Sequence, residues 1–348
     1  MRRASDDCRP RMSALELRDV VVEYEGRRGE GPVRAVAGAS LEVARGQIVG
    51  LVGESGCGKS TLARAAVGML QPLAGTIRFE QRDVRPLTRR ARPRELARLQ
   101  MVFQNPFSSL NPRRRVGEQI AEPLTVLGLA SRAQRGARVA ELLEQVGLSA
   151  AAARGFPHEF SGGQRQRIAI ARALAANPSV IVLDEPLASL DASAQAQLAN
   201  LLVHLARELD LGLLLISHDL AIVRHVADAV AVMYLGRIVE TAPTEQLWTT
   251  PLHPYTEALI GAVPRADGAG ALPEALPGEV PDPSRPPPGC RFHPRCPYTP
   301  PRALDDEPPL VEVATDRAVA CWLQRPGDEP PTRPSLKARA LAKAASAE

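Results

Sequence analysis

The fold of this chain follows from one turn, Gly53-Glu54-Ser55-Gly56-Cys57-Gly58-Lys59-Ser60-Thr61. An apolar run, residues 48–52, precedes the turn, and a helix-like stretch, residues 62–67, follows it. This order of strand, glycine loop and helix is the context in which the pattern GxxxxGK[ST] binds phosphate. Glycines allow a backbone path that turns successive N–H groups inward, and the positive end of the following helix adds to the attraction for anions.

Lys59 and Ser60 supply the polar side chains of the turn. In this pattern the lysine reaches the β- and γ-phosphates of a nucleotide, and the hydroxyl of Ser60 can ligate Mg²⁺. A chance glycine turn is the alternative, but the spacing and both flanks fit the pattern. The basic residues are nearly all arginine, and the only other lysines are Lys337 and Lys343. A compact ammonium suits a tight phosphate loop better than a guanidinium fork.

Composition limits the remaining possibilities. The chain has 348 residues, of which 45% are hydrophobic, enough for one large or two modest domains. The 43 basic and 39 acidic residues nearly balance, so charge alone gives no nucleic-acid signature. No run approaches the roughly 18 apolar residues of a membrane span, and the amino terminus lacks the apolar core of a secretory signal. The five cysteines form no disulfide framework, which predicts a reduced, cytosolic protein.

Hydrophobic periodicity predicts a mixture of strands and helices. Strands are expected at residues 15–24, 39–43, 47–52, 75–80, 99–103, 180–184 and 211–216, with a hairpin at 229–240. Helical spacing appears at residues 131–146, and residues 110–160 are interpreted as a helical insertion into an α/β domain. The arginine-rich stretch 89–99 is interpreted as a solvated helix.

A second candidate anion site is Ser161-Gly162-Gly163-Gln164, at the start of a helix that runs to Leu174. Ser161 can cap this helix, and the two glycines leave its first N–H groups accessible. An ordinary helix start is the alternative, although it would not need two glycines at this place.

Polar side chains end two apolar strands. Asp184 and Glu185 follow residues 180–183, and Asp184 is placed to hold Mg²⁺ through water. Because side chains alternate along a strand, Glu185 is predicted to point away from Asp184 and to face an attacking water. His218 follows residues 211–216, at the carboxyl edge of the sheet where α/β proteins bind ligands. A solvated loop and a structural histidine are the alternatives.

With these residues together, the chain resembles the nucleotide-binding subunit of an ATP-binding cassette (ABC) transporter. The resemblance rests on the turn at 53–60 and, in order along residues 15–245, on Gln104, Ser161-Gly162-Gly163-Gln164, Asp184-Glu185, Ser189-Leu190-Asp191 and His218. More narrowly, the chain resembles the second ATPase subunit of oligopeptide/dipeptide importers. The segments that carry this narrower resemblance are residues 101–112, 252–256, 277–281 and 289–297.

The resemblance implies a P-loop NTPase core of the α/β class, with an antiparallel β subdomain, a helical insertion and a small irregular C-terminal extension. The expected division is a flexible leader (1–13), an ATPase domain (14–245, with a helical subdomain at about 106–165), a proline-rich extension (246–325) and a disordered tail (326–348).

The resemblance also implies a role for each matching residue of the ATP site. Tyr24 would stack on adenine, and residues 53–61 would hold the triphosphate. Ser60 and Gln104 would ligate Mg²⁺, with Asp184 behind them through a water. Glu185 would be the general base, and His218 would contact the γ-phosphate.

Two subunits are expected to close head to tail, so that the residues of the second anion site complete the partner's site. The nucleotide-binding set then also includes Ser161, Gly162, Gly163, Gln164 and Asp191. The expected partners are two polytopic permeases, a second ABC ATPase subunit in a heterodimer and, indirectly, a solute-binding protein, with no nucleic acid. The expected location is peripheral, on the cytoplasmic face of a bacterial-type cell membrane.

Two alternatives to peptide import stay open at this point. Close relatives in the family handle nickel and other solutes, and the ATPase subunit does not touch the cargo. A soluble cassette ATPase acting on DNA or ribosomes is the alternative from another class. Against it, the chain has one cassette, no sustained heptads and a tail that resembles those of peptide importers.

The C-terminal extension contains Cys290, Cys296 and Cys321. Some members of the subfamily have four cysteines here, which suggests an iron–sulfur cluster, but Ala303 stands near the place of the fourth. A cluster usually needs four thiolates. His293 could complete a zinc site with the three cysteines. Reduced, metal-free thiols are the favoured interpretation.

Overall fold

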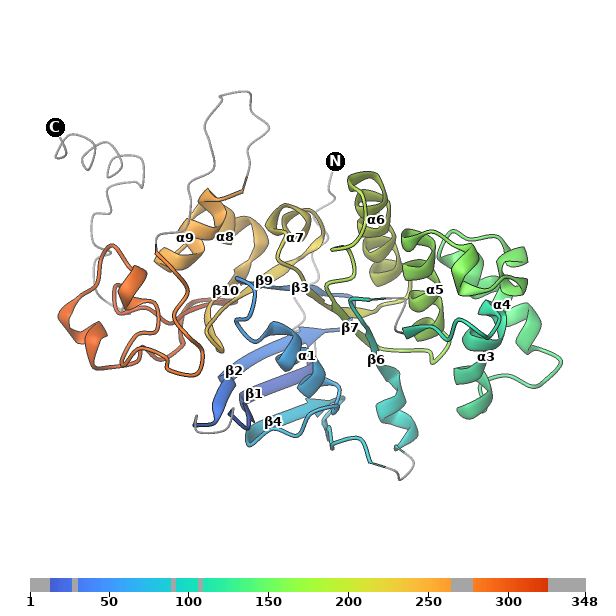
Figure 1. The fold of residues 1–348 in the computed structure, drawn as a ribbon, viewed down its shortest axis with the longest axis horizontal. Helices are drawn as coiled ribbons and strands as arrows, with labels where there is room; N and C mark the ends of the chain where they lie inside the picture. The colour runs from blue at the N-terminus through green and yellow to red at the C-terminus, as the bar shows by residue number, and fades with distance from the viewer. Residues whose placement is uncertain (1–12, 27–30, 89–91, 106–108, 264–277, 325–348) are drawn as a thin grey trace.

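The computed structural model describes residues 13–26, 31–88, 92–105, 109–263 and 278–324. Within these ranges two β-sheets form, with helices between and around them (Figure 1). Figure 1 shows α3, α4 and α5 at one end of an elongated molecule and the C-terminal extension, drawn in orange and red, at the other. The predicted leader and tail lie outside the described residues, apart from Ser13, which begins the first strand.

The smaller sheet is the antiparallel β subdomain that the sequence predicts. Its strands, in spatial order, are β2 (Val33–Ala44), β1 (Ser13–Tyr24), β4 (Ala74–Phe79) and β5 (Arg82–Asp83). Leu15 and Leu17 of β1 are buried and alternate with the half-buried Glu16, as expected for a sheet with one covered face. The register pairs Leu17 with Leu41 of β2 and with Ile77 of β4, so the apolar side chains share one face.

The larger sheet carries the ligand edge. Its strands, in spatial order, are β11 (Val311–Ala314), β12 (Arg317–Val319), β10 (Arg237–Pro243), β9 (Ala229–Tyr234), β3 (Ile48–Val52), β8 (Gly212–Ile216), β7 (Val180–Asp184) and β6 (Leu99–Val102). From β9 to β6 neighbouring strands are parallel. Every residue of β3, β7 and β8 is buried, and apart from Asp184 at the end of β7 their sequences are continuous apolar runs, as expected for strands covered on both faces.

Helix α1 (Lys59–Ala66) lies between the two sheets. Its buried residues include Leu62 and the small Ala63, Ala65 and Ala66, which let the sheets approach the helix closely. The turn at residues 53–58 therefore sits at the carboxyl edge of the parallel strands, beside the start of a packed helix.

Further helices before the C-terminal extension cover the larger sheet or form the helical part. They are α3 (Val116–Val126), α4 (Arg135–Gln145), α5 (Gly162–Leu174), α6 (Ala192–Glu208) and α7 (Leu220–Val226), with short 3₁₀ helices η2 (Ala150–Arg154) and η3 (Pro157–Glu159). The stretch 92–98 differs from the predicted solvated helix: it contains the short 3₁₀ helix η1 (Arg94–Arg98), which leads directly into β6, while residues 89–91 lie outside the described ranges.

The C-terminal extension is more regular than the sequence suggests. It contains α8 (Thr244–Thr249), α9 (Pro254–Gly261), two 3₁₀ helices, η4 (His293–Arg295) and η5 (Pro301–Leu304), and the hairpin of β11 and β12. The prediction missed this hairpin. Residues 311–313 alternate as in a strand, Asp316 takes a positive φ of 58° at the turn, and β12 pairs with β10.

Glu240 joins this extension to the larger sheet. The side chain is fully buried in β10, and its two oxygens accept backbone N–H groups from Leu252 and His253, both at 2.8 Å. Arg317 of β12 lies 3.6 Å away. Burial raises the pKa of Glu240, although the N–H groups and Arg317 favour the ionised carboxylate. One buried carboxylate thus connects the strand, the start of α9 and the hairpin.

Replacing Glu240 by alanine should lower the free energy of unfolding by about 2–4 kcal/mol, because two backbone donors lose this buried acceptor. Urea unfolding followed by circular dichroism measures the change. Glu144→Ala on the exposed face of α4 is the control and should stay within about 0.5 kcal/mol of the wild type. Equal, small changes in both variants would show that Glu240 does not anchor the extension.

Candidate nucleotide site

The phosphate loop, residues 53–61, connects β3 to the first turn of α1. Two of its glycines are required by close backbone contacts. Gly53 has φ of +153°, and a Cβ there would lie 2.1 Å from the carbonyl oxygen of Met233. Gly58 has φ of +106°, and a Cβ there would lie 2.1 Å from the carbonyl oxygen of Ala35. Only glycine fits at these two positions, so the loop path depends on both sheets.

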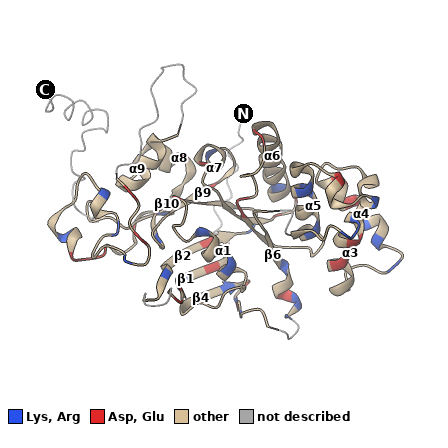
Figure 2. Ribbon diagram, viewed as in Figure 1, with Lys and Arg blue, Asp and Glu red and all other residues tan. Residues whose placement is uncertain are grey.

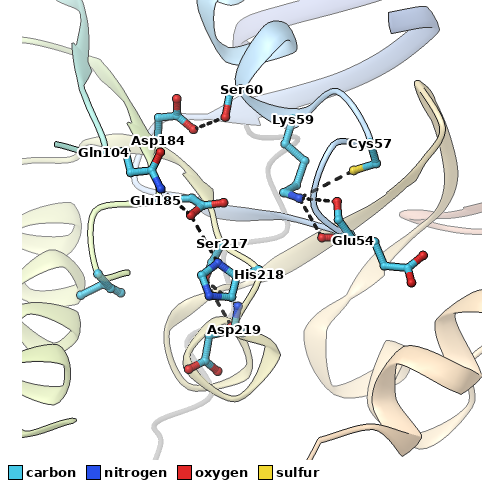
Figure 3. Close-up of polar contacts among 12 residues, drawn as sticks. Glu54, Cys57, Lys59, Ser60, Gln104, Asp184, Glu185, Ser217, His218 and Asp219 are labelled. Carbon is cyan, nitrogen blue, oxygen red and sulfur yellow. Dashed lines mark hydrogen bonds and ion pairs between the residues drawn. The ribbon is translucent and has the colours of Figure 1, made fainter. Parts of the chain in front are cut away.

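Lys59 places its ammonium inside the curve of this loop (Figure 3). Its Nζ donates to the carbonyl oxygens of Gly53 at 2.7 Å and Glu54 at 2.8 Å, and lies 3.7 Å from Sγ of Cys57. Burial raises the pKa of the Cys57 thiol, although the Lys59 ammonium opposes the shift, so this thiol stays neutral near pH 7. The loop therefore presents one buried positive charge to an anion.

Asp184 and Ser60 face each other across the edge of the sheet. The Ser60 hydroxyl donates to Oδ1 of Asp184 at 2.8 Å, and Asp184 is 3% exposed at the end of β7. Burial raises the pKa of Asp184, while the bond from Ser60 and the charge of Arg64 oppose the shift. A hydroxyl, a carboxylate and the amide oxygen of Gln104 are the hard oxygen donors that Mg²⁺ prefers, so these residues fit that ion.

Glu185 does not follow the alternation from which its direction was predicted. Strand β7 ends at Asp184, and Glu185 has a positive φ of 46°, so the strand periodicity stops before it. Its Oε2 accepts from Nε2 of Gln104 at 3.0 Å and lies 3.3 Å from Nδ1 of His218 (Figure 3). Strand alternation was the basis for predicting the direction of the Glu185 side chain. That reasoning is wrong, because Glu185 lies beyond the end of the strand. A left-handed residue at the strand end directs the carboxylate toward Gln104 and His218.

His218 and Tyr24 border this cluster. His218 follows β8, with its side chain 58% exposed, and the next residue, Asp219, caps α7 by accepting the N–H groups of Ala221 and Ile222. Tyr24 ends β1 with 40% exposure, and its hydroxyl lies 3.4 Å from Oγ1 of Thr61. An exposed aromatic ring beside the phosphate loop is suited to stacking on a flat base.

The second anion site is built as a helix start. Ser161 accepts from the Gln164 N–H at 3.3 Å, and Oε1 of Gln164 accepts from the Ser161 N–H at 2.9 Å, which forms a capping box. Asp191 caps α6 by accepting from Ala194 at 2.9 Å. Within the described ranges, neither residues 161–164 nor Asp191 make a hydrogen bond or ion pair with the phosphate loop. In the described part of a single chain, the two predicted anion sites are therefore not joined by hydrogen bonds or ion pairs.

Two residues of the C-terminal extension contact the phosphate loop. Arg295 pairs with the side chain of Glu54, and the hydroxyl of Tyr255 accepts the Glu54 N–H. The sequence singled out the segments that contain both residues only as subfamily markers. Their chemistry was not predicted, since a contact across 241 positions leaves no local pattern.

Cys290, Cys296 and Cys321 line one small cavity of the extension, together with Ala303. Burial raises the pKa of Cys290, which favours the thiol over the thiolate. Among the residues that the structure describes, no group of three His, Cys, Asp or Glu side chains is arranged to hold a metal ion. A four-thiolate cluster does not fit this cavity, because the residues that line it include three cysteines, and Ala303 contributes a methyl group where a further thiolate would be needed. Metal-free thiols stay a prediction.

None of the helices in the described ranges has both the length and the apolar character needed to cross a membrane.

Comparison with known proteins identifies the family. Residues 36–188 match the family model described as ABC transporter, and residues 239–302 match the model described as oligopeptide/dipeptide transporter, C-terminal region. The chain is 49% identical over 307 residues to the probable peptide ABC transporter ATP-binding protein y4tS of Sinorhizobium fredii, with 88% of this chain and 87% of that protein covered. It is 46% identical over 315 residues to the di/tripeptide transport ATP-binding protein DppF of Pseudomonas aeruginosa, with coverage of 89% and 97%.

A solved structure supports the fold assignment. It is a dimeric ATP-binding cassette in a post-hydrolysis state bound to ADP and Pi, 28% identical to this chain with a TM-score of 0.58. The alignment covers 66% of this chain and 98% of that one. The predicted P-loop NTPase fold is thereby confirmed. The chain belongs to the ATP-hydrolysing subunits of the ABC transporter family, in the branch that carries the oligopeptide/dipeptide transporter C-terminal region.

Proposed function

We propose that this chain hydrolyses ATP to energise the import of di- and oligopeptides through a membrane ABC transporter. The observation that carries the proposal is the cluster at one sheet edge, where Lys59, Ser60, Asp184, Gln104, Glu185 and His218 come together. The peptide cargo is inferred from the matched C-terminal region and from relatives named for peptide, dipeptide or tripeptide transport.

In this proposal each residue of the cluster has one task. The N–H groups of residues 53–61 and the Lys59 ammonium bind the triphosphate. Ser60 and Gln104 would hold Mg²⁺, with Asp184 behind them through water, and the ion would supply positive charge to offset that of the phosphates. Glu185 orients a water and takes its proton, and Gln104 and His218 fix the direction of the Glu185 carboxylate. His218 also contacts the γ-phosphate.

Residues 161–164 and Asp191 are proposed to act on the site of a second ATPase subunit. Gly162 and Gly163 have room for a side chain within their own chain. A Cβ at Gly162 would meet Leu190 at 3.6 Å, and a Cβ at Gly163 would meet Ala194 at 3.5 Å and Leu190 at 3.9 Å, which are ordinary van der Waals contacts. Neither glycine has a positive φ. Packing inside the described chain therefore does not explain the two glycines, whereas close approach of a partner's nucleotide does. One of the solved structures similar to this chain is of a dimeric cassette, which supports the proposal that two such subunits pair.

Gly163→Ala separates the two explanations. The methyl group fits the chain and improves helix propensity, so the melting temperature and the ATP affinity of the isolated subunit should match or slightly exceed the wild type. ATP turnover by the assembled transporter should fall at least about tenfold, because the methyl group enters the partner's site. Turnover is measured by phosphate release. Unchanged turnover would place this helix start outside the composite site.

Further partners follow from the same proposal: two polytopic permeases, a second ABC ATPase in a heterodimer, and a solute-binding protein that acts indirectly. The subunit would then lie on the cytoplasmic face of the cell membrane. Import of another solute, such as nickel, would use the same ATPase chemistry.

Charges of both signs are interspersed along the described ribbon, which gives no support to a role on nucleic acid (Figure 2).

The test is recovery of the tagged chain from membranes of the source organism in mild detergent, followed by mass spectrometry. Two polytopic permeases and a second cassette ATPase are expected, and a co-recovered solute-binding protein would identify the cargo class. Recovery only from the soluble fraction, together with ribosomes or nucleic acid, would contradict the transporter assignment.

A further inference from the structure

Arg295 of the C-terminal extension forms a two-pronged ion pair with Glu54 of the phosphate loop. Its Nη1 donates to Oε2 at 2.7 Å, and its Nη2 donates to Oε1 at 3.0 Å. The Arg295 side chain is 3% exposed and that of Glu54 is 19% exposed. Bidentate, charge-assisted ion pairs of this kind stabilise the structure and also fix the relative orientation of the two side chains. The phosphate loop is thus held by a residue 241 positions away.

Tyr255 makes the second contact, with the backbone of the same loop residue. Its hydroxyl accepts the N–H of Glu54 at 2.9 Å, and the residue is fully buried in α9. The rings of Tyr255, Tyr234 and Phe292 pack with centroid separations of 4.6 to 5.4 Å, and the guanidinium of Arg295 lies 5.7 Å from the Tyr234 ring centre. This aromatic base is built from β9 and the extension, so it supports both contacts rigidly.

Glu54 therefore has three polar groups held at once. Arg295 fixes its side chain, Tyr255 fixes its N–H, and its carbonyl oxygen accepts from Lys59 Nζ at 2.8 Å. The orientation of this peptide unit sets the path of the loop that curves around the Lys59 ammonium. An anion site made of backbone N–H groups depends on that path, because its donors act only when they point at the ligand.

We propose that Arg295 and Tyr255 are positioning residues for ATP: acting through Glu54, they hold the phosphate loop in its binding conformation, so the C-terminal extension controls ATP affinity. This inference rests on the proposed assignment of residues 53–61 as the ATP loop. Coupling between two sites is reciprocal. Loss of the Arg295 or Tyr255 contact with Glu54 weakens ATP binding, and bound ATP in turn stabilises these two contacts.

Arg295→Met tests the inference, since it keeps the length of the side chain and removes the fork. Titration of the full-length chain with a fluorescent ATP analogue and Mg²⁺ should show a Kd about tenfold higher than that of the wild type. In the assembled transporter KM should rise by a similar factor, while kcat stays within about twofold. Arg295→Lys keeps the charge and loses the fork, so its Kd should lie between the two.

Arg291→Met is the matched control within the same extension. Arg291 pairs with Glu307 at 3.1 Å and bonds to the carbonyl oxygen of Leu235, so its loss also loosens the extension. It makes no hydrogen bond or ion pair with Glu54 in the described part of the chain. This variant should melt at a lower temperature and bind the analogue with wild-type Kd. A wild-type Kd for Arg295→Met, or an equal rise for Arg291→Met, would overturn the inference.

Two further variants keep the test decisive. Glu54→Gln combined with Arg295→Met should raise Kd no more than the larger single change, because both remove one interaction. If Arg295→Met does not fold, Tyr255→Phe removes only the hydroxyl that accepts the Glu54 N–H and should raise Kd by a few fold. Unchanged Kd in both Tyr255→Phe and Arg295→Lys would contradict the positioning role.

Lys59→Ala distinguishes failure of this inference from failure of the ATP-loop assignment. If only the positioning role is wrong, Lys59→Ala loses affinity while the Arg295 variants keep it. If the assignment itself is wrong, Lys59→Ala also binds the analogue normally.

Discussion

Glu185→Gln is expected to lower ATP turnover by about 10²–10⁴-fold while leaving ATP binding intact, because it removes a proton acceptor and little else. Glutamine keeps the length of the side chain, and its amide oxygen can still accept the 3.0 Å bond from Gln104. Phosphate release by the purified transporter measures turnover, and titration with a fluorescent ATP analogue measures binding.

The same experiment should also trap two ATPase subunits in their closed association, since a bound and unhydrolysed γ-phosphate stays between the two anion sites. Glu144→Gln, on the exposed face of α4, is the matched control and should hydrolyse ATP at the wild-type rate. Near-normal hydrolysis by Glu185→Gln would show that Glu185 is not the general base. Its contact with His218 would then be structural.

Lys59→Ala should weaken ATP binding by at least about tenfold, because a charge-assisted bond to phosphate contributes about 1.5–3 kcal/mol. The ammonium is 5% exposed and is the positive side chain enclosed by the loop. Its loss removes the phosphate partner and also frees the carbonyl oxygens of Gly53 and Glu54, so the loop loses order as well as charge.

Fluorescent-analogue titration of the isolated chain measures this change without any partner subunit. Arg78→Ala, which removes an exposed arginine of β4, is the control and should leave the affinity unchanged. An unchanged affinity for Lys59→Ala would contradict the assignment of residues 53–61 as the phosphate loop.

The parts of the site that the sequence predicts are those with local signals. Residues 53–61 combine glycine spacing with an apolar strand before them and a helix after them. The strands that end at Asp184 and Ile216 are continuous apolar runs, so the positions of Asp184 and His218 at one sheet edge follow from the parallel sheet. The helix cap at Ser161 is also predicted by the sequence and is present in the structure, where Gln164 completes a capping box.

The parts that the sequence did not predict depend on tertiary contacts. Glu185 leaves the strand geometry through a positive φ, which residue type did not signal for a glutamate. The hairpin of β11 and β12 is short and becomes stable by pairing with β10. The pair of Arg295 with Glu54 joins distant segments, and each residue taken alone looks like an ordinary surface charge.

The most direct test of the central claim is transport by the purified complex in proteoliposomes, with a radiolabelled mixture of di- and oligopeptides as the cargo. We expect peptide movement that requires ATP and Mg²⁺ and that disappears when this chain carries Glu185→Gln. Peptide movement that is independent of ATP, or ATP hydrolysis that moves no peptide, would contradict it.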